Sequence, residues 1–298
     1  MAAPGAEPGA ASGMREMVNA MTVDVEDYFQ VSAFEGHIAR ESWDRLACRV
    51  PGNLARILDL FDRHGVRATF FTLGWIAERY PDWVRELTRE GHEVASHGYG
   101  HARVTSLSPR AFRRDVAHTK GLLEDITGEP VKGYRAPSYS ICENSRWALD
   151  VLEEEGHLYS SSVYPVRHDH YGMPDAPRHP FRPAARGRLL EVPVATVPLP
   201  GRTLPCGGGG FFRLYPYPFS RWALRRINGR EGRAGVFYFH PWEIDPGQPR
   251  VEGLPLRTRI RHYLNLGRME TRLERLLEDF SWDRMDRVFL GAGEGAEA

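Results

Sequence analysis

The chain has 298 residues, with 39 basic and 39 acidic side chains and a formal net charge of zero. Hydrophobic residues make up 42% and charged residues 26%, which is typical of a globular protein that folds in water. The balanced charge disfavours a nucleic-acid binder that depends on a broad basic face. The sequence lacks the run of about 18 apolar residues that a membrane-spanning helix requires, so we expect no transmembrane segment.

The two ends of the chain are rich in Ala, Gly, Pro and Glu. We expect residues 1–20 to form a disordered N-terminal tail and residues 286–298 to form a flexible C-terminal tail. The N-terminal stretch has no cationic segment followed by an apolar one, which a secretory signal would need. The expected location is therefore the cytoplasm, with the inner face of the membrane as a further possibility.

Strand-like and helix-like segments alternate between these tails. The patterns predict strands at 21–25, 68–73, 92–96, 131–136, 158–163, 189–196 and 235–240. Helical patterns fall between them, and a last amphipathic helix is predicted over 258–280. Such alternation implies parallel strands joined by right-handed crossovers. We therefore predict an α/β fold, a (β/α)7 barrel in one domain over 21–285 with a C-terminal helical extension; an open doubly wound sheet is the alternative.

Polar residues follow several of the predicted strands. In a β/α barrel the strand ends converge on one face, where active sites lie. The first, third, fourth and last predicted strands carry carboxylates, histidines and an arginine at or just after their ends, namely Asp24, Glu26, Asp27, His97, His101, Arg135 and His240.

His97 and His101 are spaced so that two imidazoles could bind one metal ion. Gly98 and Gly100 disfavour a helix there, so a loop would present them. Together with one carboxylate from the first strand they would form a three-ligand site with an open position, leaving another carboxylate as a base. The alternative is two surface histidines and a solvated acidic turn. Against it, Asp24 interrupts an apolar strand, where a charge needs a partner.

Five segments of the sequence resemble the polysaccharide deacetylases with a NodB homology domain, a family of metal-dependent carbohydrate esterases. They are DVEDYF, SHGYGH, YRAPSYSI, GGGGFFRL and FYFHPWE. The similarity covers about residues 21–240 and is strongest to the deacetylases of exopolysaccharide loci, the PEP-CTERM/exosortase-associated subfamily. The resemblance implies a distorted, TIM-like β/α barrel of NodB type, a divalent metal, and removal of acetyl groups from N-acetylated sugars.

The family's motifs imply roles for individual residues. Asp24 falls on the catalytic base, Arg135 on the arginine that holds the base, and His240 on the catalytic acid. His97 and His101 fall on the metal-binding histidines. The third ligand is Glu26, with Asp27 as the alternative. The usual Asp and Trp support for the acid is not evident around 160–164, and Asp169 or His168 could substitute.

The resemblance also implies a reaction and a set of partners. The metal, zinc with cobalt, nickel or manganese as alternatives, would bind the water that attacks the acetamide, and a backbone N–H near Tyr139 would help to stabilise the oxyanion. The expected partners are an N-acetylated glycan and exopolysaccharide assembly proteins, with no nucleic acid. Candidate substrate-binding residues at the strand ends are Tyr99, Pro137, Tyr139, Phe211 and Trp242, for which packing in the barrel wall is the alternative.

Two other functions fit the same residues. The first is a metal-dependent amidase acting on a small linear or cyclic amide, which predicts a closed pocket where a polymer predicts an open groove. The second is a catalytically silent glycan-binding module.

The four glycines at 207–210 are not followed by the Lys-Ser or Lys-Thr of a nucleotide-binding loop, so a loop bordering the glycan site is predicted there.

Overall fold

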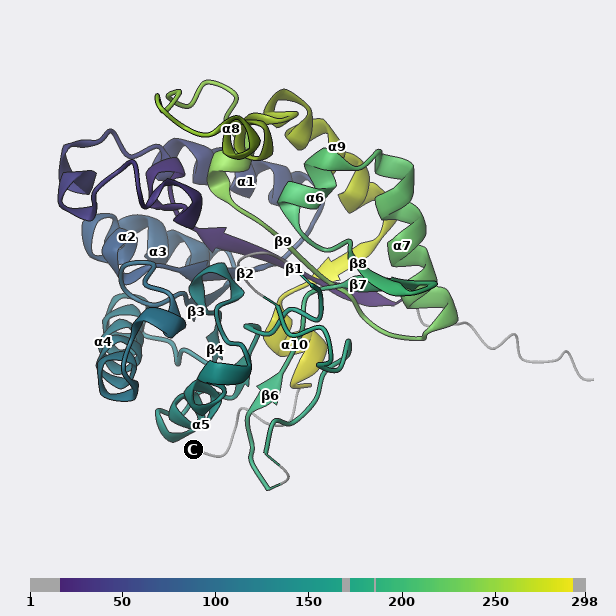
Figure 1. The fold of residues 1–298 in the computed structure, drawn as a ribbon, viewed down its shortest axis with the longest axis horizontal. Helices are drawn as coiled ribbons and strands as arrows, with labels where there is room; N and C mark the ends of the chain where they lie inside the picture. The colour runs from purple at the N-terminus through teal and green to yellow at the C-terminus, as the bar shows by residue number, and fades with distance from the viewer. Residues whose placement is uncertain (1–16, 168–171, 185, 292–298) are drawn as a thin grey trace, which may run out of the picture.

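The computed structural model describes residues 17–167, 172–184 and 186–291. Its centre is a parallel sheet in the order β10-β1-β2-β3-β4-β5-β6, with β9 also paired to β1 (Figure 1). These strands are β1 (Val18–Val25), β2 (Thr69–Thr72), β3 (Glu93–Ser96), β4 (Gly133–Tyr134), β5 (Tyr159–Ser160), β6 (Leu190–Glu191), β9 (Val236–Phe239) and β10 (Ser281–Asp283).

The sheet curls until its two ends meet. Ala20 of β1 pairs with both Val236 and Asp283, so β9 and β10 lie on opposite edges of β1. Beyond β6, the Ala195 N–H donates to the Val236 carbonyl of β9 at 3.1 Å, which bridges the remaining gap. The predicted distorted (β/α)7 barrel is thereby confirmed, and the open doubly wound sheet is wrong.

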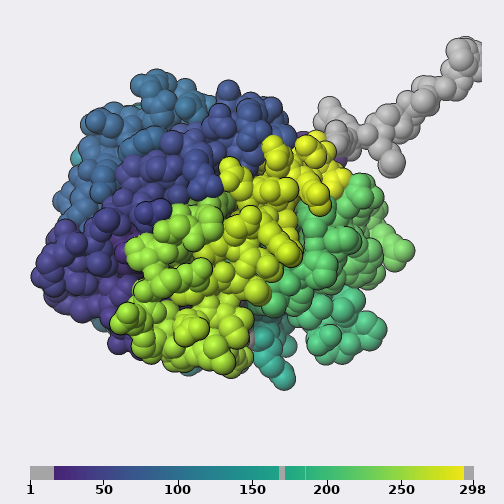
Figure 2. Space-filling model, turned by 90° about the horizontal axis from the view of Figure 1, so that it is seen from above, coloured from purple at the N-terminus to yellow at the C-terminus, as the bar shows by residue number. Residues whose placement is uncertain are grey.

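Two features of the sheet were not predicted. β10 adds a further parallel strand beside the start of β1, and Figure 2 shows the C-terminal segment packed against the N-terminal one. The sixth predicted strand, 189–196, is shorter than expected. Its last residue begins an antiparallel hairpin of β7 (Thr196–Leu199) and β8 (Arg202–Pro205).

Helices cover the outside of the curled sheet (Figure 1). They are α1 (Val50–Arg63), α2 (Gly74–Arg79), α3 (Pro81–Arg89), α4 (Pro109–Thr127), α5 (Trp147–Glu154), α6 (Gly209–Leu214), α7 (Tyr217–Arg230), α8 (Leu256–Tyr263), α9 (Met269–Asp279) and α10 (Met285–Phe289). Local signals define α4, because the Ser108 hydroxyl accepts from the Ala111 N–H and Gly128 ends the helix at φ 70°. The predicted helix over 258–280 is broken in two, because Asn265 has a left-handed φ of 54°.

Both predicted tails are shorter than expected within the described residues. Val18, Asn19 and Ala20 belong to β1, and α10 covers four residues of the predicted C-terminal tail. The rest of the two tails, 1–16 and 292–298, lies outside the described residues. Among the described helices, none has the length and apolar character needed to cross a bilayer.

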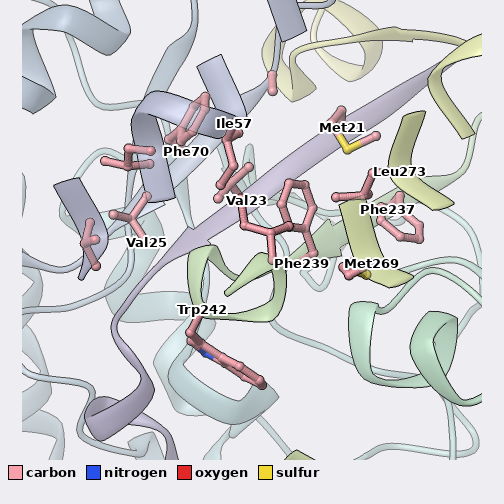
Figure 3. Packing of buried hydrophobic residues seen from close by; sticks show 14 of the residues in the cluster. Met21, Val23, Val25, Ile57, Phe70, Phe237, Phe239, Trp242, Met269 and Leu273 are labelled. Atoms are coloured by element: carbon pink, nitrogen blue, oxygen red, sulfur yellow. The ribbon is translucent and has the colours of Figure 1, made fainter. Parts of the chain in front are cut away.

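β1 is buried on both faces. Its side chains alternate between the hydrophobic core outside the barrel and the polar interior of the barrel. Met21, Val23 and Val25 pack outward against Phe237, Phe239 and the helices α1 and α9 (Figure 3). Successive side chains of a strand point to opposite faces, so Thr22 and Asp24 point into the barrel. The core thus holds the strand from one side while the other side carries polar groups.

Candidate active site

A cavity of about 440 Å³ opens where the parallel strands end. Its lining combines the end of β1, the loops after β3, β4 and β9, and helix α8. The lining residues are Asp24, Glu26, Val31, Ser32, Ala33, His97, His101, Arg103, Ser138, Tyr139, Gly210, Arg213, Tyr238, His240, Trp242, Thr258, Arg261 and His262. The fold therefore brings the predicted base, both histidines and the predicted acid to one place.

Glu26, His97 and His101 form a cluster that could hold a metal ion. One ligand atom from each lies within 4.8 Å of the others, and all three side chains are buried. His101 Nε2 is 2.7 Å from Glu26 Oε2, yet that oxygen accepts no well-formed hydrogen bond from any described residue. Two imidazoles and a carboxylate whose buried Oε2 lacks such a bond fit a divalent ion such as zinc.

The loop between the two histidines depends on Gly98. Its φ is +72°, a left-handed backbone that most side chains avoid, and an added Cβ would lie 2.9 Å from Asp115 Oδ2. His101 itself has a φ of 56°. Strained backbone of this kind tends to gather at functional sites, where the surrounding structure holds it in place.

His97 is oriented by a backbone carbonyl. Its Nδ1 lies 2.8 Å from the Arg135 carbonyl oxygen, so Nδ1–H donates there and Nε2 is left for the cluster. Burial lowers the pKa of His97 to about 4, despite the nearby Asp24 charge. The imidazole is therefore neutral near pH 7, which is the form that binds metals.

The two candidate carboxylates are separated by the structure. Burial alone raises the pKa of Glu26, but the charges of His101 and His240 outweigh it and hold the pKa well below its usual range. Asp27 points elsewhere, because its carboxylate accepts the backbone N–H groups of Tyr28, Arg49 and Val50. The structure thus places Glu26 in the cluster and Asp27 outside it, at the start of α1.

Asp24 is held by Arg135 inside the barrel. Arg135 Nη1 donates to Asp24 Oδ1 at 2.6 Å and to the Thr22 hydroxyl at 2.8 Å. The guanidinium also donates to the backbone carbonyl and the hydroxyl of Ser161, and it lies 4.0 Å above the Phe71 ring. Both charges are almost fully buried, so this network fixes the carboxylate in position.

His240 lines the same cavity, next to Asp24 and Glu26. Its Nε2 is 3.9 Å from Asp24 Oδ2 and 3.4 Å from Glu26 Oε1. Its Nδ1 is 2.7 Å from Glu243 Oε1. Burial alone lowers the pKa of His240, but Glu26, Glu243 and Asp24 outweigh it and raise the pKa to about 9. The imidazole is therefore charged near pH 7 and able to donate a proton.

Sequence reasoning missed Glu243 and its partner Arg213. The signal was present, since Glu243 lies three residues after His240, as in a capping box, and its carboxylate also accepts the His240 backbone N–H. The supports predicted instead, His168 and Asp169, lie outside the described residues.

The candidate substrate-binding aromatics divide into two groups. Tyr139 lines the cavity, and the edge of Trp242 reaches it. The ring of Trp242 stacks on His240 at 5.2 Å and on His262 at 4.2 Å, however, and its Nε1–H donates to Glu26 Oε1 at 3.3 Å. Trp242 therefore packs against the residues of the site and helps to hold the Glu26 carboxylate.

The other three candidates lie outside the described lining of the cavity. Tyr99 turns away, since its hydroxyl donates to Glu78 and its ring packs on His118. Pro137 is buried, and Phe211 stacks on Tyr215. The Tyr139 N–H already donates to the Ala136 carbonyl at 3.0 Å, so it is not the oxyanion donor that was expected nearby.

Comparison with known families agrees with the sequence motifs. Residues 42–156 match the family model described as polysaccharide deacetylase, and residues 161–290 match a domain of unknown function, DUF3473. Residues 42–156 thus match the polysaccharide deacetylases, and the predicted resemblance is confirmed. Asp24 and Glu26 precede the first match, whereas Arg213, His240 and Glu243 fall within the second.

Similar proteins with assigned names match over part of their length. The peptidoglycan-N-acetylglucosamine deacetylase of Bacillus cereus is 34% identical over 96 residues, which cover 32% of this chain and 35% of that protein. The chitooligosaccharide deacetylase of Rhizobium leguminosarum bv. trifolii is 39% identical over 69 residues, 23% of this chain and 32% of that protein. The matched stretches therefore span about a third of these relatives.

One solved structure shares the fold over nearly the whole chain. A putative polysaccharide deacetylase from Mycobacterium smegmatis superposes with a TM-score of 0.57 at 19% identity, covering 95% of this chain and 93% of that one. At this identity the likeness establishes the barrel fold alone.

Proposed function

We propose that this protein is a divalent-metal-dependent N-deacetylase that acts on a glycan containing N-acetylhexosamine. The observation that carries the proposal is the convergence of three groups in one cavity: the Glu26, His97 and His101 cluster, the Asp24–Arg135 pair, and His240. The names of the relatives support the same substrate class.

The chain's own residues suit each proton transfer of amide hydrolysis. Asp24 is fixed through Oδ1 by Arg135, and its Oδ2 faces the cavity on the side of His240. A water beside Asp24 loses its proton to this carboxylate as its oxygen attacks the acetamide carbon. A divalent ion held by Glu26, His97 and His101 would activate that water and polarise the carbonyl oxygen.

His240 is the candidate acid for the second proton transfer. An amide nitrogen leaves poorly as an anion, so it must gain a proton as the C–N bond breaks. His240 Nε2 faces the cavity, and the charged imidazole carries the required proton. Asp24 and His240 thus act as base and acid, and the products are acetate and a free amine.

The cavity fits a short stretch of sugar. Its volume of about 440 Å³ lies in the lower part of the range for small-molecule sites, roughly 300–1,000 Å³. We propose zinc as the ion and exopolysaccharide modification as the process, with assembly proteins as partners. We further propose a cytoplasmic location, where a lipid-linked precursor at the inner face of the membrane could be the substrate.

Acetate release tests this function directly. The purified protein, loaded with zinc, is incubated with N-acetylglucosamine oligomers of increasing length, and acetate is measured enzymatically. We expect release that stops with a chelator, and we expect Asp24→Asn to abolish turnover while retaining the metal. Wild-type rates in Asp24→Asn would refute the assigned base, and no acetate from any oligomer would refute the glycan substrate.

A small-amide amidase is the second candidate. The specific observation in its favour is that α8 and residues 31–33 both contribute to the wall of the cavity, whose volume is only about 440 Å³. Hydrolysis of small linear or cyclic amides without hydrolysis of oligomers would favour this function. A protein that binds oligomers but no metal, and releases no acetate, would instead be a glycan-binding module.

A further inference from the structure

We propose that Glu243, held in place by Arg213, is the residue that positions His240 for proton donation. The inference rests on the proposed deacetylase function and assigns a task to the C-terminal region, residues 161–290. His240 Nδ1 lies 2.7 Å from Glu243 Oε1, and Arg213 Nε lies 2.6 Å from Glu243 Oε2. Glu243 and Arg213 are buried, so the contacts are shielded from water.

The contact with Glu243 determines which nitrogen of His240 acts. Because Nδ1 donates its proton to the carboxylate, the transferable proton sits on Nε2, which faces Asp24 and Glu26 in the cavity. As the C–N bond of the substrate breaks, this proton passes from Nε2 to the departing nitrogen. The imidazole then becomes neutral, with Nδ1–H still directed at Glu243.

Arg213 holds the Glu243 carboxylate in place through its other oxygen, Oε2. Its guanidinium donates to the backbone carbonyls of His262 at 2.9 Å and Leu264 at 2.7 Å, as well as to Glu243. Trp242 stacks on His240 and so restrains the plane of the ring. The imidazole is thus held at Nδ1 and across one face of its ring, so that Nε2 points towards the cavity.

The glycine run at 207–210 provides the space for this arrangement. A Cβ on Gly209 would lie 2.3 Å from Glu243 Oε1, and one on Gly208 would lie 2.7 Å from the Tyr238 ring. Nothing lies within 4 Å of a Cβ on Gly210. The run therefore allows the carboxylate to approach the backbone of α6, which the sequence motif alone did not explain.

All of these groups lie in residues 161–290, the match to the domain of unknown function. Within the described residues, this region supplies the acid His240, its carboxylate partner and the arginine behind it. Residues of the N-terminal half supply the base Asp24 and the cluster of Glu26, His97 and His101. We infer that the C-terminal region is required for catalysis because it delivers a correctly oriented acid.

A comparison of two leaving groups tests the proposal. Glu243→Gln is assayed on an N-acetylglucosamine oligomer and on an aryl acetate, whose phenolate leaves without a proton. We expect kcat on the amide to fall by about 10²-fold with KM unchanged, because general acid catalysis contributes at about this level. The aryl ester rate should fall less than about 5-fold, and metal content should stay the same.

Glu231→Gln is the matched control. Glu231 also pairs with an arginine, Arg178, at 3.1 Å and is largely buried, but it does not line the described cavity. We expect its activity on both substrates to equal that of the wild type. A merely structural role for Glu243 predicts equal losses on amide and ester, and either that result or an unchanged amide rate overturns the proposal.

Gly209→Ala is a second test variant, to be used if Glu243→Gln fails to fold. The added methyl group displaces the carboxylate while both charges remain, so the same selective loss on the amide is expected. Gly229→Ala in α7, whose methyl group also meets nothing within 4 Å and which does not line the described cavity, is its control. An inactive wild type would instead contradict the proposed function and is distinguishable from these outcomes.

Discussion

Replacing Arg135 with Met should expose how strongly the fold depends on the pair that holds the base. Arg135 is fully buried and makes its shortest hydrogen bond, 2.6 Å, to the buried Asp24. Removing one partner of a buried ion pair leaves the other charge uncompensated and typically costs about 3–5 kcal/mol. For a domain of this size, each kcal/mol lowers the melting temperature by about 2–4 °C, so Arg135→Met should melt about 6–20 °C lower.

The measurement is urea and thermal unfolding in the presence of a chelator, because a bound metal would stabilise the native state. The double variant Asp24→Asn/Arg135→Met removes both charges, and we expect it to recover at least half of the lost free energy of unfolding. Arg146→Met is the control, since its pair with Glu143 is exposed and its loss should change stability by less than about 0.5 kcal/mol.

Two results would refute this reasoning. One is a loss of less than about 1 kcal/mol in Arg135→Met, which would mean that Asp24 is not an uncompensated buried charge in the variant. The other is a double variant that is no more stable than the single one, which would assign the loss to packing against Phe71.

Three further predictions concern other buried residues of the protein. Glu26→Ala should lose bound zinc by elemental analysis, whereas Asp27→Asn should retain it and lose about 1 kcal/mol of stability as a weakened cap; loss of zinc in both would contradict the separation of the two carboxylates. Gly209→Ala should destabilise the protein by about 1–3 kcal/mol through overpacking against Glu243, and Gly210→Ala should not; urea unfolding checks both, and equal stabilities would count against the close approach. Burial raises the pKa of Glu191 to about 7. The folded state therefore binds the extra proton, and this group's contribution to stability declines by about 3 kcal/mol as the pH rises from 4.5 through 7. Glu191→Gln should flatten that decline between pH 5 and pH 8, and an unchanged slope would contradict the shifted pKa.

The fold was largely predictable because its signals are local. The seven strands of the barrel appear in the predicted places, although several are shorter, because β-branched and apolar runs between glycines and prolines indicate buried strands. β10 was missed because only pairing with β1 makes Ser281–Asp283 a strand. The break between α8 and α9 was missed because it depends on the left-handed backbone of Asn265, which leaves little trace in the hydrophobic pattern.

The candidate site was predictable only as a set of strand ends. Polar side chains after apolar strands identified Asp24, His97, Arg135 and His240, since the ends of parallel strands must share one face. The aromatic candidates were less reliable. Whether an aromatic face is open or covered depends on neighbours distant in sequence, and His262 covers Trp242 from a helix of the C-terminal extension.

The strands in chain order, and the polar groups at their ends, could be predicted from the sequence, because periodicity and residue type are local properties. The roles of those polar groups depend on contacts that form only in the folded barrel. Glu26 enters the cluster and Asp27 caps α1, because neighbouring residues on an extended chain point to opposite sides. Glu243 lies only three residues after His240, but its Oε2 is held by Arg213, 30 residues earlier, and its carboxylate approaches the backbone at Gly209. Such contacts join segments that no local pattern connects.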